Sequence, residues 1–335
     1  MSSNETLALD PLVTKILLVF NLLVCAETVG LFGILGNIFN IWNFSKQGID
    51  DSVTVTLLAL AVSEIGALVA KQGYNIVSTP WMSVGSGDID PWALGFIFFY
   101  LNGYFIRVSG LITAYATFER CVLVFWPFKA KLILTREMAV IANSSIYFVL
   151  LIYLLPYFYL VQFEYDFIPK FNKSIFTAYL RSNTEDLVLM TNVLFVITDM
   201  ATPDLIFLIN IICTSLIVRH LKTKAQWRKT VTLSFKKNSK EHSARKEKRV
   251  IVMLVTLSVV FIVCLLPHCI VLTIFTVLDN YFYLMPLTYS FTFLLETINC
   301  SVSCIIYYKM SRKYRDVTIK MLGDFKKNVL SRKIH

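Results

Sequence analysis

Seven long apolar runs constrain this chain more than any other feature of its sequence. A helix that crosses a bilayer needs about 20 mostly apolar residues. Runs of at least that length cover residues 16–43, 53–78, 92–125, 138–162, 191–218, 250–278 and 284–308. The composition agrees, because 56% of the 335 residues are hydrophobic and 16% are charged, whereas a soluble domain carries about a quarter charged residues. The sequence therefore predicts an integral membrane protein, an all-α bundle of seven membrane-spanning helices.

The stretch after the last run has a different pattern. Residues 310–326 mix basic and apolar side chains at helical spacing. Such a segment favours an amphipathic helix that lies along the membrane surface. We expect residues 1–335 to form a single domain, made of the seven spans and this surface helix.

The basic residues indicate the orientation of the spans. With seven spans, the segments 44–52, 126–137 and 219–249 share one side with the tail from residue 309, and with Arg120 they hold 26 of the 32 Lys and Arg residues. Basic loops stay on the cytoplasmic side, so the N-terminus is expected outside. The sequons at Asn4 and Asn172 then lie outside as candidate glycosylation sites. We expect a multi-pass protein of the plasma membrane.

The cysteines and the chain start carry little chemistry of their own. All seven cysteines lie in apolar runs or at their ends, which is typical of small buried side chains rather than of a disulfide framework. No Cys/His spacing suggests a metal site, and we expect no cofactor. The first residues lack the basic region of a signal peptide, so the first run is expected to insert as an anchor.

An acid–base pair interrupts the third run. Glu119-Arg120 lies deep in apolar sequence that stops at Pro127, and in this topology the pair sits at the cytoplasmic end of the span. The segment ATFERCVLVFWPFKAK resembles the Asp/Glu-Arg-Tyr segment of rhodopsin-like (class A) G protein-coupled receptors and their second-loop proline. With Cys121 in place of the aromatic residue, the FERC form resembles invertebrate, molluscan-type receptors for peptides or chemosensory ligands.

Motifs similar to those of the same family follow in order along the other runs. They are Gly36-Asn37 in the first run, LALAVSE ending at Glu64 in the second, Pro203 in the fifth, FIVCLLP from Phe261 to Pro267 in the sixth, and Asn299 to Arg315 in the seventh. The resemblance assigns the transmembrane switch core to Asn37, Glu64, Ser109, Phe261, Pro267, Asn299 and Ser303.

The chain also departs from the family pattern. Leu265 replaces a tryptophan and Cys304 a proline, and Gly95 stands where the family has a disulfide cysteine, so the outer loop 163–190 must be ordered otherwise or be loose. The family commonly holds a sodium ion near Glu64, Ser109, Asn299 and Ser303. The longer acid at position 64 and the serine at position 303 put that ion in doubt.

The resemblance implies a ligand-controlled switch rather than an enzyme. Its partner would be a heterotrimeric G protein, and its coupling residues would be Glu119, Arg120, Glu247 and Tyr307. In the family's resting state the arginine is held by its neighbouring acid and by an acid at the foot of the sixth span, here Glu247. A charge pair that forms in one packing and breaks in another is a plausible two-state element.

Several charged side chains fall inside the predicted spans. Such residues are rare, face the bundle interior and tend to pair. We predict an Arg107–Asp199 pair, and a pair of Lys71 with Glu296 or with Glu27. These four pocket candidates, Lys71, Arg107, Asp199 and Glu296, either hold helices together or face a ligand. In the second case they would favour a charged ligand such as a peptide terminus or an amino acid.

Other classes of protein account for the sequence less well. A transporter or channel with charged residues along an ion path is the main alternative, but no paired broken spans occur in matching halves. The basic inner loop fits anionic lipid and a G protein better than nucleic acid. A retinal pigment is disfavoured because the first lysine of the seventh span is Lys309, at the inner edge. An extracellular peptide and a small chemosensory molecule remain open as the ligand.

Overall fold

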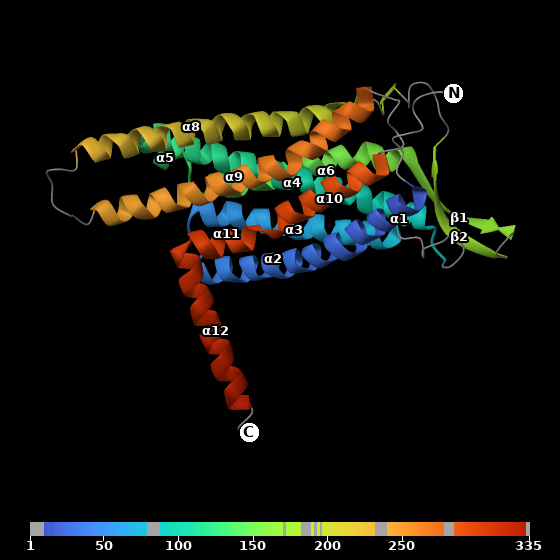
Figure 1. Cartoon of the computed structure of the whole chain (residues 1–335), viewed down its shortest axis with the longest axis horizontal. Coiled ribbons are helices and arrows are strands. Elements are labelled where there is room, and N and C mark those ends of the chain that lie inside the picture. The colour runs from blue at the N-terminus through green and yellow to red at the C-terminus, as the bar shows by residue number, and fades with distance from the viewer. Residues whose placement is uncertain are drawn as a thin grey trace.

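The computed structural model describes residues 10–78, 88–169, 172–181, 189–190, 193–194, 196–231, 240–277 and 285–332. Within these residues the chain is a bundle of long helices with one two-stranded sheet (Figure 1). Seven helical segments are long and apolar enough to cross a membrane, namely Leu12–Gln47, Ser52–Val77, Pro91–Phe125, Arg136–Leu160, Val196–Lys224, Arg249–Ile274 and Leu287–Met310. Each overlaps one predicted span, and the predicted fold class is confirmed.

The spans are assembled from α-helices and two π-helical segments, η2 and η4. The elements before the sheet are α1 (Pro11–Val19), η2 (Phe20–Ala26), α2 (Glu27–Gln47), α3 (Ser52–Val77), α4 (Pro91–Phe125), α5 (Pro127–Ile133) and α6 (Arg136–Leu160). The sheet and the elements after it are β1 (Val161–Ile168), β2 (Lys173–Leu180), η4 (Val196–Ala201), α8 (Thr202–Val231), α9 (Lys240–Val277), α10 (Met285–Ser301), α11 (Ser303–Met310) and α12 (Arg312–Arg332).

Short polar residues set the starts of the helices. A carboxylate oxygen of Asp51 accepts the amide of Thr54 at 2.7 Å at the start of α3, and Asp90 accepts the amide of Trp92 at 3.0 Å at the start of α4. These side chains satisfy backbone N–H groups that have no partner within the helix. At the other end of α2, Gly48 adopts a φ of 86°, a conformation that favours glycine and ends the helix.

Helix α4 forms the centre of the bundle. It packs against α3, α6, α8 and α9, and its residues Val108 and Ile112 have an exposed fraction of 0%. The outward faces are apolar too, since Phe32 and Leu35 of α2 are exposed. Apolar side chains on both the inside and the outside of a helix are expected when the surrounding solvent is lipid.

In the described part of the outer loop between the fourth and fifth spans, the chain forms a β-hairpin. Strands β1 and β2 pair antiparallel from Val161 with Leu180 to Ile168 with Lys173, and Asn172 lies in the turn with a φ of 48°. The hairpin stands at one end of the bundle, whereas α5 and the start of α12 lie at the other (Figure 1). Following the distribution of basic residues, we call these the outer and the inner ends.

Hydrogen bonds tie this hairpin to the start of α4, where the family has its disulfide. The amide of Phe176 donates to the carbonyl of Asp88 at 2.8 Å, and the amide of Asp90 donates to the carbonyl of Phe176 at 2.7 Å. The hydroxyl of Thr177 also donates to the Asp90 carboxylate at 3.0 Å. The hairpin is thus held on α4 without a disulfide, and all seven cysteines of the chain are free.

The seventh span is broken although it lacks the proline. Helix α10 ends at Ser301 and α11 begins at Ser303. The hydroxyl of Ser301 donates to the carbonyl of Val29 at 3.1 Å and that of Ser303 to the Glu64 carboxylate at 2.8 Å. Serine side chains on both sides of the break therefore anchor it to α2 and α3.

Helix α12 leaves the bundle at a steep angle after Ser311 (Figure 1). It corresponds to the amphipathic helix predicted over 310–326, with its ends shifted to Arg312 and Arg332. The side chain of Asn43 donates to the carbonyl of Tyr314 at 3.1 Å and to the hydroxyl of Thr318 at 2.8 Å. Burial raises the pKa of the Tyr314 phenol, so this group stays protonated and donates to Asn40 at 2.7 Å.

Candidate functional site

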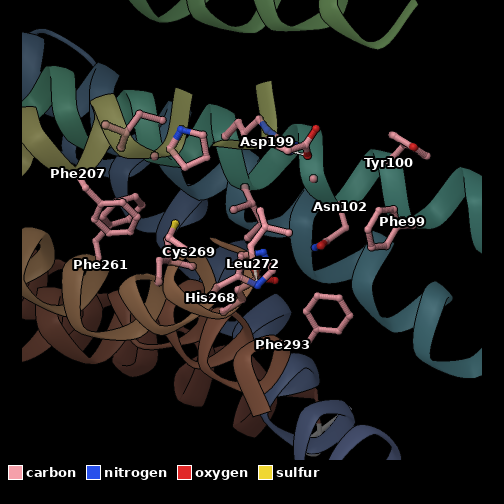
Figure 2. A pocket seen from close by; sticks show the side chains of 18 residues that line it. Phe99, Tyr100, Asn102, Asp199, Phe207, Phe261, His268, Cys269, Leu272 and Phe293 are labelled. Carbon is pink, nitrogen blue, oxygen red and sulfur yellow. Dashed lines mark hydrogen bonds and ion pairs between the residues drawn. The ribbon is translucent and has the colours of Figure 1, made fainter. Parts of the chain in front are cut away.

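A cavity of about 110 Å³ lies in the outer half of the bundle (Figure 2). Residues of four spans line it, from α4 (Phe99 to Gly110), from η4 and α8 (Asp199 to Phe207), from α9 (Phe261 to Leu272) and from α10 (Phe293 and Glu296). Most lining side chains are apolar or aromatic, with a few charged groups among them. Such a mixture is typical of ligand sites, in which polar groups fix orientation.

The predicted pair of Arg107 with Asp199 forms on one wall of this cavity. The Arg107 guanidinium is paired with the Asp199 carboxylate, and its Nε donates to the carbonyl of Thr198 at 3.0 Å. The Tyr157 hydroxyl donates to the other Asp199 oxygen at 2.9 Å. The π-helical turn of η4 positions Thr198 and Asp199 at this wall. These bonds join the third, fourth and fifth spans around charges that remain part of the cavity lining.

The predicted pair of Lys71 with Glu296 forms on the opposite side. The ammonium lies 3.0 Å from the Glu296 carboxylate, with exposed fractions of 3% for Lys71 and 5% for Glu296. It also lies 3.3 Å from the centroid of the Phe293 ring, which adds a cation–π contact. The Nδ1 of His268 approaches the second Glu296 oxygen at 3.3 Å. Glu27, the alternative partner of Lys71, instead accepts a hydrogen bond from Asn75 at 3.0 Å.

Aromatic side chains form the two ends of the cavity. Figure 2 shows Phe99 and Tyr100 toward one end and Phe207 and Phe261 at the other. The outer residues belong to the aromatic run from Phe96 to Phe105, which divides between lining and packing: Phe99 and Tyr100 line the cavity, whereas Phe96 packs against the hairpin residue Phe163. The inner rings form a core cluster with Leu265, which stands where the family has tryptophan.

Three of the predicted switch-core residues meet below the cavity. The Ser303 hydroxyl contacts both the Glu64 carboxylate at 2.8 Å and the Asn37 side-chain oxygen at 3.2 Å. The Asn37 amide donates to the carbonyl of Cys300 at 2.8 Å, and Asn40 extends the network by donating to Asn37 at 2.9 Å. This buried network joins the first, second and seventh spans.

The remaining switch-core residues are placed separately. Phe261 belongs to the cluster at the cavity floor, and Pro267 lies inside α9. Ser109 and Asn299 are buried, but no hydrogen bond joins either of them to Glu64 among the described residues. The Glu64 carboxylate instead accepts a hydrogen bond from Ser303, and no ion enters the function that we derive.

At the inner end, Glu119 and Arg120 form a compact charged unit. The carboxylate lies 3.7 Å from the guanidinium and accepts a hydrogen bond from the hydroxyl of Ser52, the first residue of α3. The exposed fractions are 1% for Glu119 and 8% for Arg120. The charged unit lies at the inner end of the third span, where the sequence placed it, but it is buried rather than open to water.

Tyr307 is the third coupling candidate whose side chain the structure describes. It is buried near the inner end of the bundle. Its ring centroid lies 5.2 Å from that of Phe44 and 5.8 Å from that of Tyr314. Its hydroxyl has no hydrogen-bond partner among the described residues. Glu247 belongs to α9, but its side chain lies outside the part of the chain that the structure describes, as does the whole of Asn4.

Sequence reasoning missed several residues of this arrangement. His268 could have been found, since a histidine inside an apolar run next to Pro267 is itself a polar group at membrane depth. Tyr157 and Ser52 carry no such signal, because tyrosine and serine are common in and around spans. The same holds for the contact of Thr117 with Asn210 at 3.2 Å and with Ser258 at 2.6 Å, which joins the third, fifth and sixth spans.

Comparison with known proteins assigns the family. A search of curated proteins gave no match. A scan against protein-family models matches residues 36–307 to the 7 transmembrane receptor (rhodopsin family). This match covers most of the chain and includes all seven spans in part or in full. The chain therefore belongs to the rhodopsin family of seven-transmembrane receptors, which reside in membranes, signal through G proteins and are not enzymes.

Proposed function

We propose that the outer cavity binds an extracellular ligand that carries charge, either the end of a peptide or a small chemosensory molecule. The observation that supports this proposal is the placement of Arg107, Asp199 and Glu296 in the lining of one apolar, aromatic cavity. A ligand with charges of both signs could exchange with these wall pairs without leaving a buried charge unmatched. Because the chain belongs to a receptor family, we prefer this function to that of a transporter or channel.

The proposal includes the coupling residues at the inner end. In one packing of the helices Arg120 would be held by Glu119, and in the other it would contact the heterotrimeric G protein. The Tyr307 hydroxyl would change its partner in the same transition. Asn37, Glu64, Ser109, Phe261, Pro267, Asn299 and Ser303 would transmit the change between the cavity and this end. We also propose that residues 1–335 form one receptor domain of the invertebrate FERC type, with glycans at Asn4 and Asn172.

G protein activation tests this function. Cells that express the receptor are exposed to size-fractionated tissue extract, and activation is followed by a proximity signal between receptor and G protein. We expect the wild type to respond and Arg120→Ala to lose the response at equal surface level. Arg136→Ala, which removes an exposed arginine at the start of α6, is the matched control and should respond normally. Protease treatment of the active fraction separates a peptide from a small molecule.

The resting lock makes a second, independent prediction. If Glu247 holds Arg120 in the resting packing, Glu247→Ala removes a stabilising charge from that packing alone and raises basal signalling severalfold. Basal signalling is measured without ligand at matched surface expression. Glu241→Ala, which removes an acid six residues earlier in α9, is the control. Unchanged basal signalling in Glu247→Ala would contradict the lock.

A further inference from the structure

A second hollow lies at the inner end of the bundle, away from the outer cavity. Its volume is about 430 Å³. Two elements and the start of a third form its walls: α9 contributes Arg249 and Val252, α11 contributes Lys309 and Met310, and α12 contributes Arg312 and Arg315. Four of these six lining residues are cations, and none of the six is acidic.

The hollow is therefore a site of concentrated positive charge. None of its four cations forms an ion pair with a carboxylate of the described residues. Three of them, Arg249, Lys309 and Arg312, are exposed, and Arg315 is half-buried. Four like charges around one hollow attract an anion more strongly than the same charges spread along a helix. A ligand with several negative charges gains the most from this arrangement.

The position of the hollow indicates where such an anion would come from. Arg249 is the first residue of the sixth span and Met310 is the last residue of the seventh. The hollow thus lies where the apolar spans end, which is the level of the lipid headgroups. Helix α12 leaves the bundle at this level (Figure 1). The cytoplasmic leaflet carries anionic lipids, and basic pockets between spans on this side bind their headgroups.

We propose that this hollow binds the headgroup of a phosphoinositide from the cytoplasmic leaflet. The phosphate groups of such a headgroup lie close together, so one headgroup could contact Arg249 of α9 and the cations of α11 and α12 at the same time. Three of the cations are arginines, whose planar guanidinium groups bind phosphate oxygens in pairs. Val252 and Met310 place apolar surface beside the cations, as an amphiphilic ligand requires.

Binding at this place has a consequence for the packing of the helices. The headgroup would bridge Arg249 of α9 and the cations of α11 and α12. A ligand stabilises the packing in which it makes more contacts. A phosphoinositide here therefore favours the packing in which the foot of α9 lies beside α11, over any packing in which they separate.

The test measures lipid binding directly, without the outer ligand or a G protein. The purified full-length receptor, carrying a fluorophore, is placed in phosphatidylcholine nanodiscs, and energy transfer to a labelled phosphatidylinositol bisphosphate is titrated. The variant is Arg312→Gln/Arg315→Gln. The matched control is Lys313→Gln/Lys320→Gln, which removes two charges from the same helix at exposed positions that do not line the hollow.

We expect the variant to bind the phosphoinositide about 25-fold more weakly, from roughly fivefold for each cation of the hollow. The control should lose far less, because its two lysines do not line the hollow. Phosphatidylserine at equal charge should bind the wild type much more weakly than the phosphoinositide. The losses of affinity caused by Arg249→Gln and Arg312→Gln should not add up in the double variant, because both arginines hold the same headgroup.

Several outcomes would overturn the proposal. Equal losses in the variant and the control, or equal binding of phosphatidylserine, would mean general attraction to anionic lipid. Soluble inositol trisphosphate should compete weakly with the labelled phosphoinositide for the wild type. This measurement does not depend on the folding of any variant. Equal affinity of the soluble headgroup would assign the hollow to a free anion. If an acidic peptide bound there and the phosphoinositide did not, the hollow would be a protein contact.

Discussion

Lys71 and Glu296 lie at membrane depth, and their charged groups meet at 3.0 Å with almost no exposure. An ion pair of this kind is not a large source of stability, because removing both charges from water is costly. Removal of one partner is different, since it leaves the other charge buried without compensation. The consequences of single and double substitutions at this pair should therefore differ sharply.

We predict that Glu296→Gln destabilises the receptor by about 3–5 kcal/mol, because Lys71 loses its counter-charge inside the bundle. The double change Lys71→Met/Glu296→Gln should recover most of that loss. Glu164→Gln, at an exposed hairpin position, should change stability by less than about 0.5 kcal/mol. Thermal unfolding of the purified receptor measures all three. A double variant as unstable as the single one would contradict the pairing.

Tyr307 carries a buried hydroxyl without a partner among the described residues, which costs about 1–3 kcal/mol relative to a satisfied group. We predict that Tyr307→Phe stabilises the ligand-free receptor by about 1 kcal/mol and weakens signalling, if the hydroxyl finds its partner only in the active packing. Tyr308→Phe, at the exposed neighbouring position, should change neither. Unfolding temperature and G protein activation are compared. Stabilisation without a loss of signalling would rule out the switching role.

At the scale of elements, the β-hairpin shows how backbone pairing replaces a covalent link. Phe176 exchanges two backbone hydrogen bonds with the residues before α4, and Thr177 adds one from its side chain to Asp90. Each such bond contributes about 1 kcal/mol, so the three bonds together are comparable to a disulfide, which contributes about 2–4 kcal/mol. Hydrogen bonds, unlike a disulfide, open without the breaking of a covalent bond, so the hairpin can separate from α4 by local opening.

We predict that Thr177→Val, which keeps the side-chain shape but removes the bond to Asp90, speeds hydrogen exchange of the β2 amides about fivefold. This corresponds to a loss of about 1 kcal/mol for local opening. Tyr179→Phe is the matched control, because it removes an exposed bond to Asp166 at 2.7 Å within the hairpin. Equal acceleration in both variants would mean that the bond to α4 has no special part in holding the hairpin.

At the scale of the whole molecule, the orientation of the bundle decides which sequons can be modified. Asn172 is exposed in the hairpin turn at the outer end, whereas Asn143, which also begins a sequon, is buried in α6 with an exposed fraction of 3%. We predict a mass shift on enzymatic deglycosylation that decreases in Asn172→Gln. Ser145→Ala, which removes the other sequon but leaves Asn143 in place, should leave the shift unchanged. A mass shift that Asn172→Gln leaves unchanged would contradict the prediction, and it is the result expected if the hairpin faced the cytoplasm.

The sequence by itself determined the properties that depend on local composition. Apolar length determined the seven spans and the alternation of basic loops predicted their orientation, because the membrane acts on each segment separately. The FERC segment and the motifs in the other spans pointed to the family that residues 36–307 match. Two charge pairs were also predictable, since buried charges must be matched and few partners were available.

Only the tertiary structure decided the properties that depend on packing between distant segments. It chose Glu296 over Glu27 for Lys71 and brought His268 to the same carboxylate. It ordered the outer hairpin on α4 and gathered four cations from α9, α11 and α12 around one hollow. Helix spacing in the sequence places a side chain on a face of its own helix. Which neighbour that face meets is determined by how all the helices pack together, and no single segment contains that information.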